Sequence, residues 1–135
     1  MTDDDLEPGD PAMRFALQDF LDFELHRGEG RGSARIAAVD ERHVQPQGVV
    51  HGGVVFTLVD TAMGAAASSV LDDGRFCATS DLQIRYLRPA FGGSLAATAE
   101  VVNAGSRLVT VEGRVTDGDD RLIATATGAF AVLSV

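Results

Sequence analysis

Residues 51–71 read HGGVVFTLVDTAMGAAASSVL, and Asp60 is the only Asp, Glu, Lys or Arg among them. A run of this length and apolar character is typical either of a membrane span or of a helix in a protein core. Its glycines, hydroxyl side chains and central carboxylate argue against the bilayer, where a carboxylate at the midplane costs about 2.5–3.5 kcal/mol. We therefore predict a buried helix over residues 53–71, closed by the turn residues Asp72-Asp73-Gly74.

Before and after this helix in the sequence, apolar and polar residues alternate in the manner of β-strands. The alternation is clearest where Val109, Val111 and Val115 alternate with polar residues. The short turns after the helix imply antiparallel neighbours, because a parallel crossover needs a dozen or more residues. A helix this apolar must be covered on nearly every side. We predict an α+β fold in which a curved antiparallel sheet wraps the helix, ending in a meander. The expected strands are residues 23–27, 33–39, 76–88, 94–104, 107–116 and 121–133.

The amino-terminal residues 1–9 are acidic and polar, and we predict a disordered leader there, followed by a single domain over residues 10–135. Asp10-Pro11 is a favourable helix start, since Asp caps helices and Pro fits the first helical position. The apolar spacing from Phe15 to Leu21 predicts that this short amphipathic helix ends at Leu21. The acidic start is neither a secretory signal nor a basic transit peptide, so we expect a cytoplasmic protein.

The 135-residue chain has a formal net charge of −9, and its one cysteine is Cys77. A single cysteine excludes an intramolecular disulfide framework and a Cys-based zinc finger. The acidic balance argues against a broad basic face for nucleic acid or an anionic membrane, and we expect neither as a partner. His26 and His43 lack metal-ligand spacing, so we expect them on turns or at the surface and predict no metal site.

Residues that can carry chemistry gather in residues 43–60, HVQPQGVVHGGVVFTLVD. Two glycines at a helix start let another group approach the free N–H donors there, and the helix dipole favours a developing oxyanion or a thioester carbonyl. Gln45 and His51 can add polar contacts at the same mouth. A carboxylate in an apolar helix is costly unless it is paired or employed. Asp60 is therefore a candidate nucleophile or base, with a structural pairing to backbone or to an Arg as the alternative.

The spacing of these groups bears on assembly. Gly53 and Asp60 are seven residues apart, which is two helical turns and about 10 Å of rise. An oxyanion donor and a base must both lie within about 3 Å of the reacting group. One chain cannot easily place both on one carbonyl, whereas two antiparallel copies of the helix can. The spacing predicts an obligate homodimer with two equivalent sites at its interface.

The order of these motifs resembles the hotdog-fold acyl-CoA thioesterases of the PaaI-like, 4-hydroxybenzoyl-CoA thioesterase-type family. The resemblance rests on G-x-x-H-G-G at residues 48–53, on Asp60, and on TSDLQIRYLRP at residues 79–89 followed by Gly92-Gly93-Ser94-Leu95. It covers roughly residues 15–133. It implies a long helix wrapped by an antiparallel sheet, hydrolysis of an acyl-CoA thioester, and a dimer of dimers, that is, a homotetramer.

The resemblance also implies roles for single residues. Asp60 matches the catalytic carboxylate, acting as nucleophile or as base on water. Gly52 matches the residue whose N–H polarises the thioester carbonyl, with His51 beside it. Thr79 falls where a hydroxyl positions water or the carboxylate. Gln45 departs from the commoner Asn at its place but keeps the amide.

The expected substrate is an aryl- or medium-chain acyl-CoA, and since CoA is part of the substrate no cofactor is expected. Gly53 at the helix start, together with Arg88 and Arg107, forms the expected substrate-binding set. An acidic protein needs local cations to hold the CoA phosphates, although either Arg could instead make a solvated salt bridge. Two other functions stay open: a non-catalytic acyl-CoA-binding module, which would not need Asp60, and a hotdog hydratase or dehydratase, which places its acidic residue differently.

Overall fold

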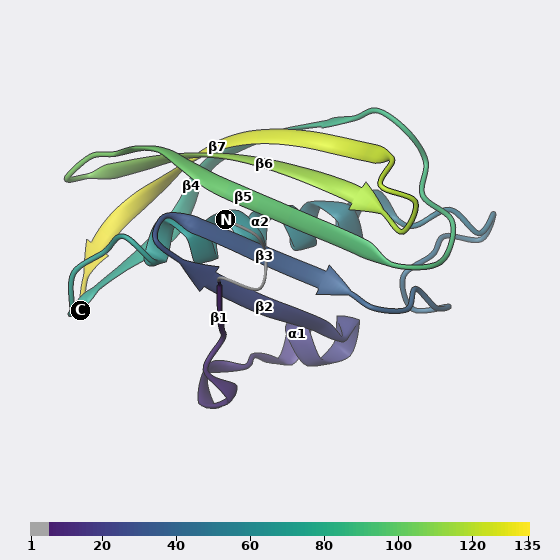
Figure 1. Cartoon of the computed structure of the whole chain (residues 1–135), viewed down its shortest axis with the longest axis horizontal. Helices are drawn as coiled ribbons and strands as arrows, with labels where there is room; N and C mark the ends of the chain where they lie inside the picture. Colours follow the sequence, from purple (N-terminus) through teal and green to yellow (C-terminus); the bar gives the residue numbers. More distant parts are fainter. Residues whose placement is uncertain (1–5) are drawn as a thin grey trace.

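The computed structural model describes residues 6–135, in which a seven-stranded sheet curves over one long helix (Figure 1). The strand order is β1-β2-β3-β5-β6-β7-β4, and every pairing is antiparallel. This arrangement confirms the α+β architecture. The strands are β1 (Glu7–Pro8), β2 (Phe23–Gly28), β3 (Arg31–Ile36), β4 (Arg75–Tyr86), β5 (Leu95–Ala104), β6 (Leu108–Asp117) and β7 (Leu122–Ser134); the helices are α1 (Ala16–Leu21) and α2 (Gly52–Ser68).

The core lies between α2 and the concave side of the sheet. Alternate strand residues point inward, as the period of two requires, and meet the apolar residues of the helix. Gly32 on β3 allows the closest approach, because a Cβ built there would lie 2.7 Å from the backbone nitrogen of Ala66. Among the largest fully buried side chains are Phe23, Leu58, Val59, Met63, Val111 and Phe130.

The amino-terminal helix is shorter than expected, and the predicted start at Asp10-Pro11 is wrong. Pro11–Met13 form a single 3₁₀ turn, and Phe15 is extended (φ −123°, ψ 161°) before α1 begins. The extended backbone lets the ring of Phe15 contact that of Phe23 edge to face, with centroids 6.0 Å apart. Phe15 makes this contact with β2 from an extended backbone, so the contact favours a break in the helix at Phe15.

Part of the predicted disordered leader is placed in the structure. Leu6 is buried, and Glu7 and Pro8 pair with Arg27 and His26 of β2. Burial of the leucine and the hydrogen-bonding edge of β2 explain why these residues are ordered. The rest of the predicted leader, residues 1–5, lies outside the described residues.

β4 does not neighbour β5, so the predicted meander is wrong at this point. β4 pairs with β7 at the far edge of the sheet, while β5 lies beside β3. Residues 87–94 cross between these positions, which are three strand spacings or about 14 Å apart. An extended segment of this length spans up to about 27 Å, so a short connection does not require a hairpin. Hydrogen bonds from the N–H of Val50 to Ala90 O (2.7 Å) and from the N–H of Val39 to Gly93 O (2.8 Å) fix the crossing.

The sheet does not close, and it leaves one stripe of α2 partly exposed. We name as the open stripe the partly or fully exposed residues that recur every three or four positions along α2: Gly53, Phe56, Thr57, Asp60, Thr61, Gly64 and Ser68. The other residues from Val54 to Ala67 are buried. The helix is therefore covered on its other faces but not on nearly every side. Among the described residues, no helix is long and apolar enough to cross a membrane.

Candidate active site

A tight loop leads the chain into α2. Val44 and Val50 form an isolated antiparallel bridge, and the N–H of Gln45 donates to Val49 O at 2.8 Å. At the base of this loop, the N–H of His51 donates to His43 O at 2.8 Å. The loop thus fixes where the helix begins, and it leaves the side chain of Gln45 exposed.

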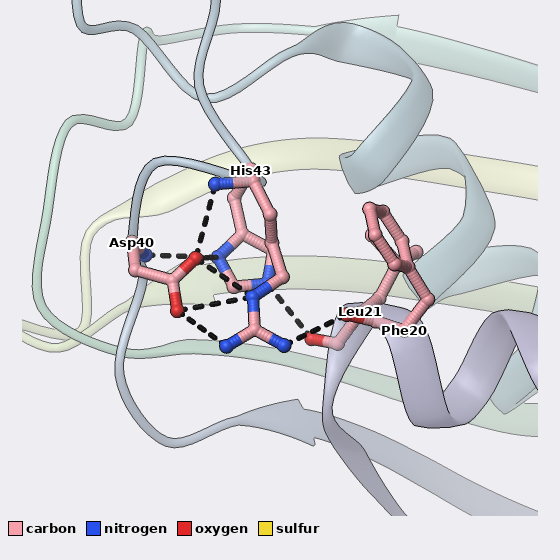
Figure 2. Close-up of polar contacts among 5 residues, drawn as sticks. Phe20, Leu21, Asp40 and His43 are labelled. Carbon is pink, nitrogen blue, oxygen red and sulfur yellow. Dashed lines mark hydrogen bonds and ion pairs between the residues drawn. The ribbon is translucent and has the colours of Figure 1, made fainter.

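The loop is anchored through His43, which lies on a turn, one of the two expected positions, but is buried, with 1% of its surface exposed. Its Nδ1 accepts from the N–H of Asp40 at 2.9 Å, and its Nε2–H donates to Leu21 O at 2.7 Å (Figure 2). Arg42 bridges the Asp40 carboxylate and Phe20 O, the latter at 2.9 Å. The hydrogen bond from the Arg42 guanidinium holds the pKa of the Asp40 carboxyl below its usual range. Both ring nitrogens of His43 are hydrogen-bonded, so its role is to join this loop to the end of α1.

The first turn of α2 presents a free donor. His51 is the N-cap, and its Nδ1 accepts from the N–H of Gly53 at 2.8 Å. Gly52 is the first helical residue, where an N–H has no partner within the helix. Within residues 6–135 no acceptor is found for it. The carbonyl of Gly52 accepts from the hydroxyl of Tyr86 at 2.8 Å. Gly52 therefore offers its N–H at the positive end of the helix dipole.

Asp60 meets Thr79 on the open stripe. The Thr79 hydroxyl donates to Asp60 Oδ1 at 2.7 Å. Thr79 pairs with Phe130 on β7 just before the register shifts by one residue towards Asp81. Asp60 is half-buried and not fully inside the core, because the sheet leaves this face of the helix uncovered. The structure therefore brings the Thr79 hydroxyl and the Asp60 carboxylate together.

The other predicted site residues lie apart from this pair. Gly52 and Asp60 are separated by about 12 Å of helical rise. Arg88 follows Tyr86 and lies at the same end of the sheet as Gly52, with its N–H on Ile123 O. The carbonyl of Arg107 accepts from the N–H of Val132, about 30 Å further along β7. A single chain thus brings one of the two arginines near the start of α2.

A groove of about 900 Å³ runs beside the open stripe, between the amino-terminal segment and the beginning of β4. Asp60 and Thr79 are in its wall, together with the apolar side chains of Phe15 and Phe130. The thiol of Cys77 also faces it, and burial raises the pKa of that thiol. Across the described part of the chain, no group of three or more His, Cys, Asp or Glu side chains could hold a metal ion.

Tyr86 is the residue of this region that sequence reasoning did not single out as part of the site. It stands within the TSDLQIRYLRP run, where alternation along β4 places it on the same inward side as Leu82 and Ile84. That alternation was the available signal. What the sequence could not show is that the inward side of β4 at this point faces the start of α2.

Comparisons with known proteins show the family and the fold of the chain. Residues 47–124 match the thioesterase superfamily. Over 114 residues the chain is 34% identical to a Saccharolobus solfataricus protein named "Putative esterase", covering 84% of this chain and 75% of that one. A thioesterase of Haemophilus influenzae superposes with a TM-score of 0.82 at 28% identity, covering 88% and 83% of the two chains. A Bacillus halodurans protein solved with CoA gives 0.80 at 35% identity, covering 90% and 80%.

The chain belongs to the thioesterase superfamily. It is a thioester hydrolase with the hotdog fold, which confirms the family and the architecture inferred from its sequence.

Proposed function

We propose that this thioesterase hydrolyses an aryl- or medium-chain acyl-CoA to the free acid and CoA, at sites shared between the two subunits of a homodimer. The observation that carries the proposal is the division of the site along α2. The free N–H of Gly52 stands at the start of the helix, and Asp60 with its Thr79 partner stands about 12 Å further on. Each position supplies half of the chemistry that a thioester hydrolysis needs.

The chemistry assigns a role to each half. The Asp60 carboxylate either takes a proton from water, whose oxygen adds to the thioester carbonyl carbon, or adds to that carbon itself and is then released by water. The N–H of the partner's Gly52 stabilises the negative charge on the carbonyl oxygen. The C–S bond then breaks, and the CoA sulfur leaves as the thiolate and is protonated. The acid and free CoA are the products by either route.

The pairing of β4 explains how two subunits complete one site. β4 is the outermost strand, and among the described residues its second edge has no strand partner. Such an edge is a template for another strand, here β4 of a second copy. On β4, Thr79 lies beside Asp60 and Tyr86 beside Gly52. Antiparallel pairing of two β4 strands centred between residues 82 and 83 puts Thr79 near the partner's Tyr86, and hence Asp60 near the partner's Gly52.

The surroundings supply places for both ends of the substrate. The groove that has Asp60 in its wall has a volume of about 900 Å³, and the apolar side chains of Phe15 and Phe130 in that wall suit an acyl or aryl group. Arg88, at the Gly52 end, is the candidate for the CoA phosphates, with Arg107 reaching the ligand only from another subunit. The Bacillus halodurans neighbour solved with CoA supports a CoA ester as substrate. We extend the proposal to a dimer of dimers in a cytoplasmic enzyme.

The experiment is a free-thiol release assay over a panel of aryl and straight-chain acyl-CoA esters. Wild type should release CoA from at least one ester, and Asp60→Asn and Asp60→Ala should lose nearly all turnover. Asp22→Asn, which changes an exposed carboxylate after α1 that is not in the wall of the groove, is the matched control and should keep the wild-type rate. A wild type that binds acyl-CoA without releasing thiol, or Asp60 variants with full activity, would contradict the proposal.

A further inference from the structure

The Gly52–Gly53 peptide group is held at both ends. Its carbonyl accepts from the Tyr86 hydroxyl at 2.8 Å, and its N–H donates to His51 Nδ1 at 2.8 Å. Two successive glycines have the widest backbone freedom of any dipeptide. Without these bonds, the first turn of α2 would be its least constrained part. The two bonds restrict the peptide plane next to the one that carries the Gly52 N–H.

Tyr86 fits this position by shape as well as by its hydroxyl. A Cβ built on Gly52 would lie 3.4 Å from the Tyr86 oxygen and 3.5 Å from the ring carbon that bears it. The ring therefore packs directly against the backbone of Gly52. Burial raises the pKa of Tyr86 above its ordinary value, so the hydroxyl stays protonated and can donate throughout the neutral range. Tyr86 makes no contact with Asp60 and lies at the opposite end of β4 from the Thr79 pair.

The same bonds fix the state of His51. Because Nδ1 accepts from the N–H of Gly53, the N–H of the ring is at Nε2. The bonds form a chain from the Tyr86 hydroxyl, through one peptide group, to the imidazole, and members of such a chain polarise one another. The start of α2 thus has two separate hydrogen-bond donors: the N–H of Gly52 and the Nε2–H of His51.

We propose that Tyr86 is a positioning residue for the thioesterase reaction, holding the Gly52–Gly53 peptide so that the Gly52 N–H points at the thioester carbonyl. The inference rests on the proposed function. Donors that stabilise a transition state must be oriented before the reaction begins. Removing the hydroxyl therefore lowers kcat while leaving ground-state binding, and so KM, largely unchanged.

The test is Tyr86→Phe, which removes one oxygen and keeps the ring against Gly52. We expect kcat to fall about 5- to 10-fold, as for the loss of one hydrogen bond in the transition state, with KM changed less than about 2-fold. The amide of Gly53 should exchange its hydrogen faster in NMR, because the peptide is released at its carbonyl end. Thr125→Val, which deletes a hydroxyl from the outer side of β7, is the matched control and should change neither quantity.

The outcomes separate this inference from the function on which it rests. If Tyr86→Phe keeps wild-type kcat and wild-type Gly53 exchange while Asp60→Asn is inactive, the positioning role is wrong and the proposed function stands. If Tyr86→Phe loses folding stability with no change in kcat for the folded fraction, the residue is structural and the inference is overturned. If wild type turns over no acyl-CoA, the proposed function falls and the positioning role falls with it.

Discussion

The Thr79 hydroxyl on β4 and Oδ1 of Asp60 on α2 lie 2.7 Å apart in a hydrogen bond that Thr79 donates. This bond ties the acidic side chain of the central helix to the edge strand of the sheet. Oδ2 of Asp60 receives no hydrogen bond from any of the described residues, and Asp60 is in the wall of the groove. The orientation of the carboxylate therefore depends on one hydroxyl.

Replacing Thr79 by Val should test that dependence. Valine keeps the shape and the strand preference of threonine, but it removes the donor to Asp60. We expect kcat to fall about 10-fold, because a hydrogen bond to a charged group is worth about 1.5 kcal/mol or more. Thr79→Ser should recover most of the rate. The measurement is kcat from steady-state kinetics with the acyl-CoA that wild type hydrolyses fastest. Thr110→Val, on the outer face of the sheet, is the control. Equal rates for Thr79→Val and wild type would remove Thr79 from the site.

A second prediction concerns the backbone donor of Gly52, which only proline can delete. Proline is favoured at the first helical position, and His51 before it already has the extended backbone (φ −60°, ψ 134°) that a following proline requires. Gly52→Pro should therefore fold, yet lose about 100- to 1,000-fold in kcat, the range for one oxyanion donor.

Gly52→Ala is the matched control for this variant. It keeps the N–H, and its Cβ would meet Tyr86 at 3.4 Å, an ordinary contact distance. Its kcat should stay within a few-fold of wild type. If the alanine and proline variants lose activity equally, the side chain and not the missing N–H is responsible, and Gly52 is not the oxyanion donor.

Stability should depend on the close approach of β3 to α2. In Gly32→Ala the new Cβ would press on the backbone of Ala62 and lie 2.7 Å from the nitrogen of Ala66. Backbone cannot move aside as a side chain can, so we expect a loss of about 3 kcal/mol in the free energy of unfolding. Gly92→Ala is the control, because no atom lies within 4 Å of a Cβ there. Urea unfolding measures both, and equal stabilities would show that β3 and α2 are not packed this closely.

The loop that precedes α2 should make stability depend on acidity. The Arg42 hydrogen bond lowers the pKa of Asp40 in the folded chain, below the value of about 3.9 expected when unfolded. A carboxyl with a lowered folded pKa stabilises the protein above the unfolded pKa, and this contribution is lost as pH falls through the folded pKa. Asp40→Asn should therefore be less stable than wild type at pH 7, with the difference shrinking below about pH 4.

The measurement is urea unfolding of wild type and Asp40→Asn at several pH values. Asp73→Asn, which changes an exposed carboxylate of the same type, should show no such convergence with wild type. A difference between wild type and Asp40→Asn that stays constant from pH 7 to about pH 3 would mean that the Asp40–Arg42 contact does not contribute to folding.

Much of the fold could be predicted because it depends on local signals. The alternation around Val111 and the turns at Gly105-Ser106 and residues 117–120 predicted the β5-β6-β7 hairpins, and the apolar run predicted α2. The position of β4 could not be read in this way. Short connections favour neighbours, but residues 87–94 are held across the molecule by hydrogen bonds to Val39 and Val50, which are distant in sequence. The break before α1 likewise follows from a tertiary contact, that of Phe15 with Phe23.

The same distinction between local signals and contacts distant in sequence applies to the site residues. Asp60 and Gly52 stood out because a carboxylate in an apolar helix and paired glycines at a helix start are unusual in themselves, whereas Thr79 was indicated only by the family resemblance. His43 was expected on a turn or at the surface, and its burial was not predicted, because nothing in its neighbours along the chain shows that Leu21 O and the Asp40 N–H would bond both ring nitrogens. Arg88 and Arg107 looked equivalent in the sequence, and only the register of β7 shows that they contact this strand at positions about 30 Å apart along it.

Subunit mixing tests directly whether one active site combines Asp60 of one subunit with Gly52 of its partner. Asp60→Asn and Gly52→Pro, each inactive alone, are denatured together at equal concentration, refolded and assayed for thiol release. Hybrid dimers contain one site with both Asp60 and Gly52 intact, so the mixture should recover about a quarter of wild-type activity. If each subunit carried a complete site, every site in the mixture would have one defect, and an inactive mixture of correctly assembled dimers would contradict the account.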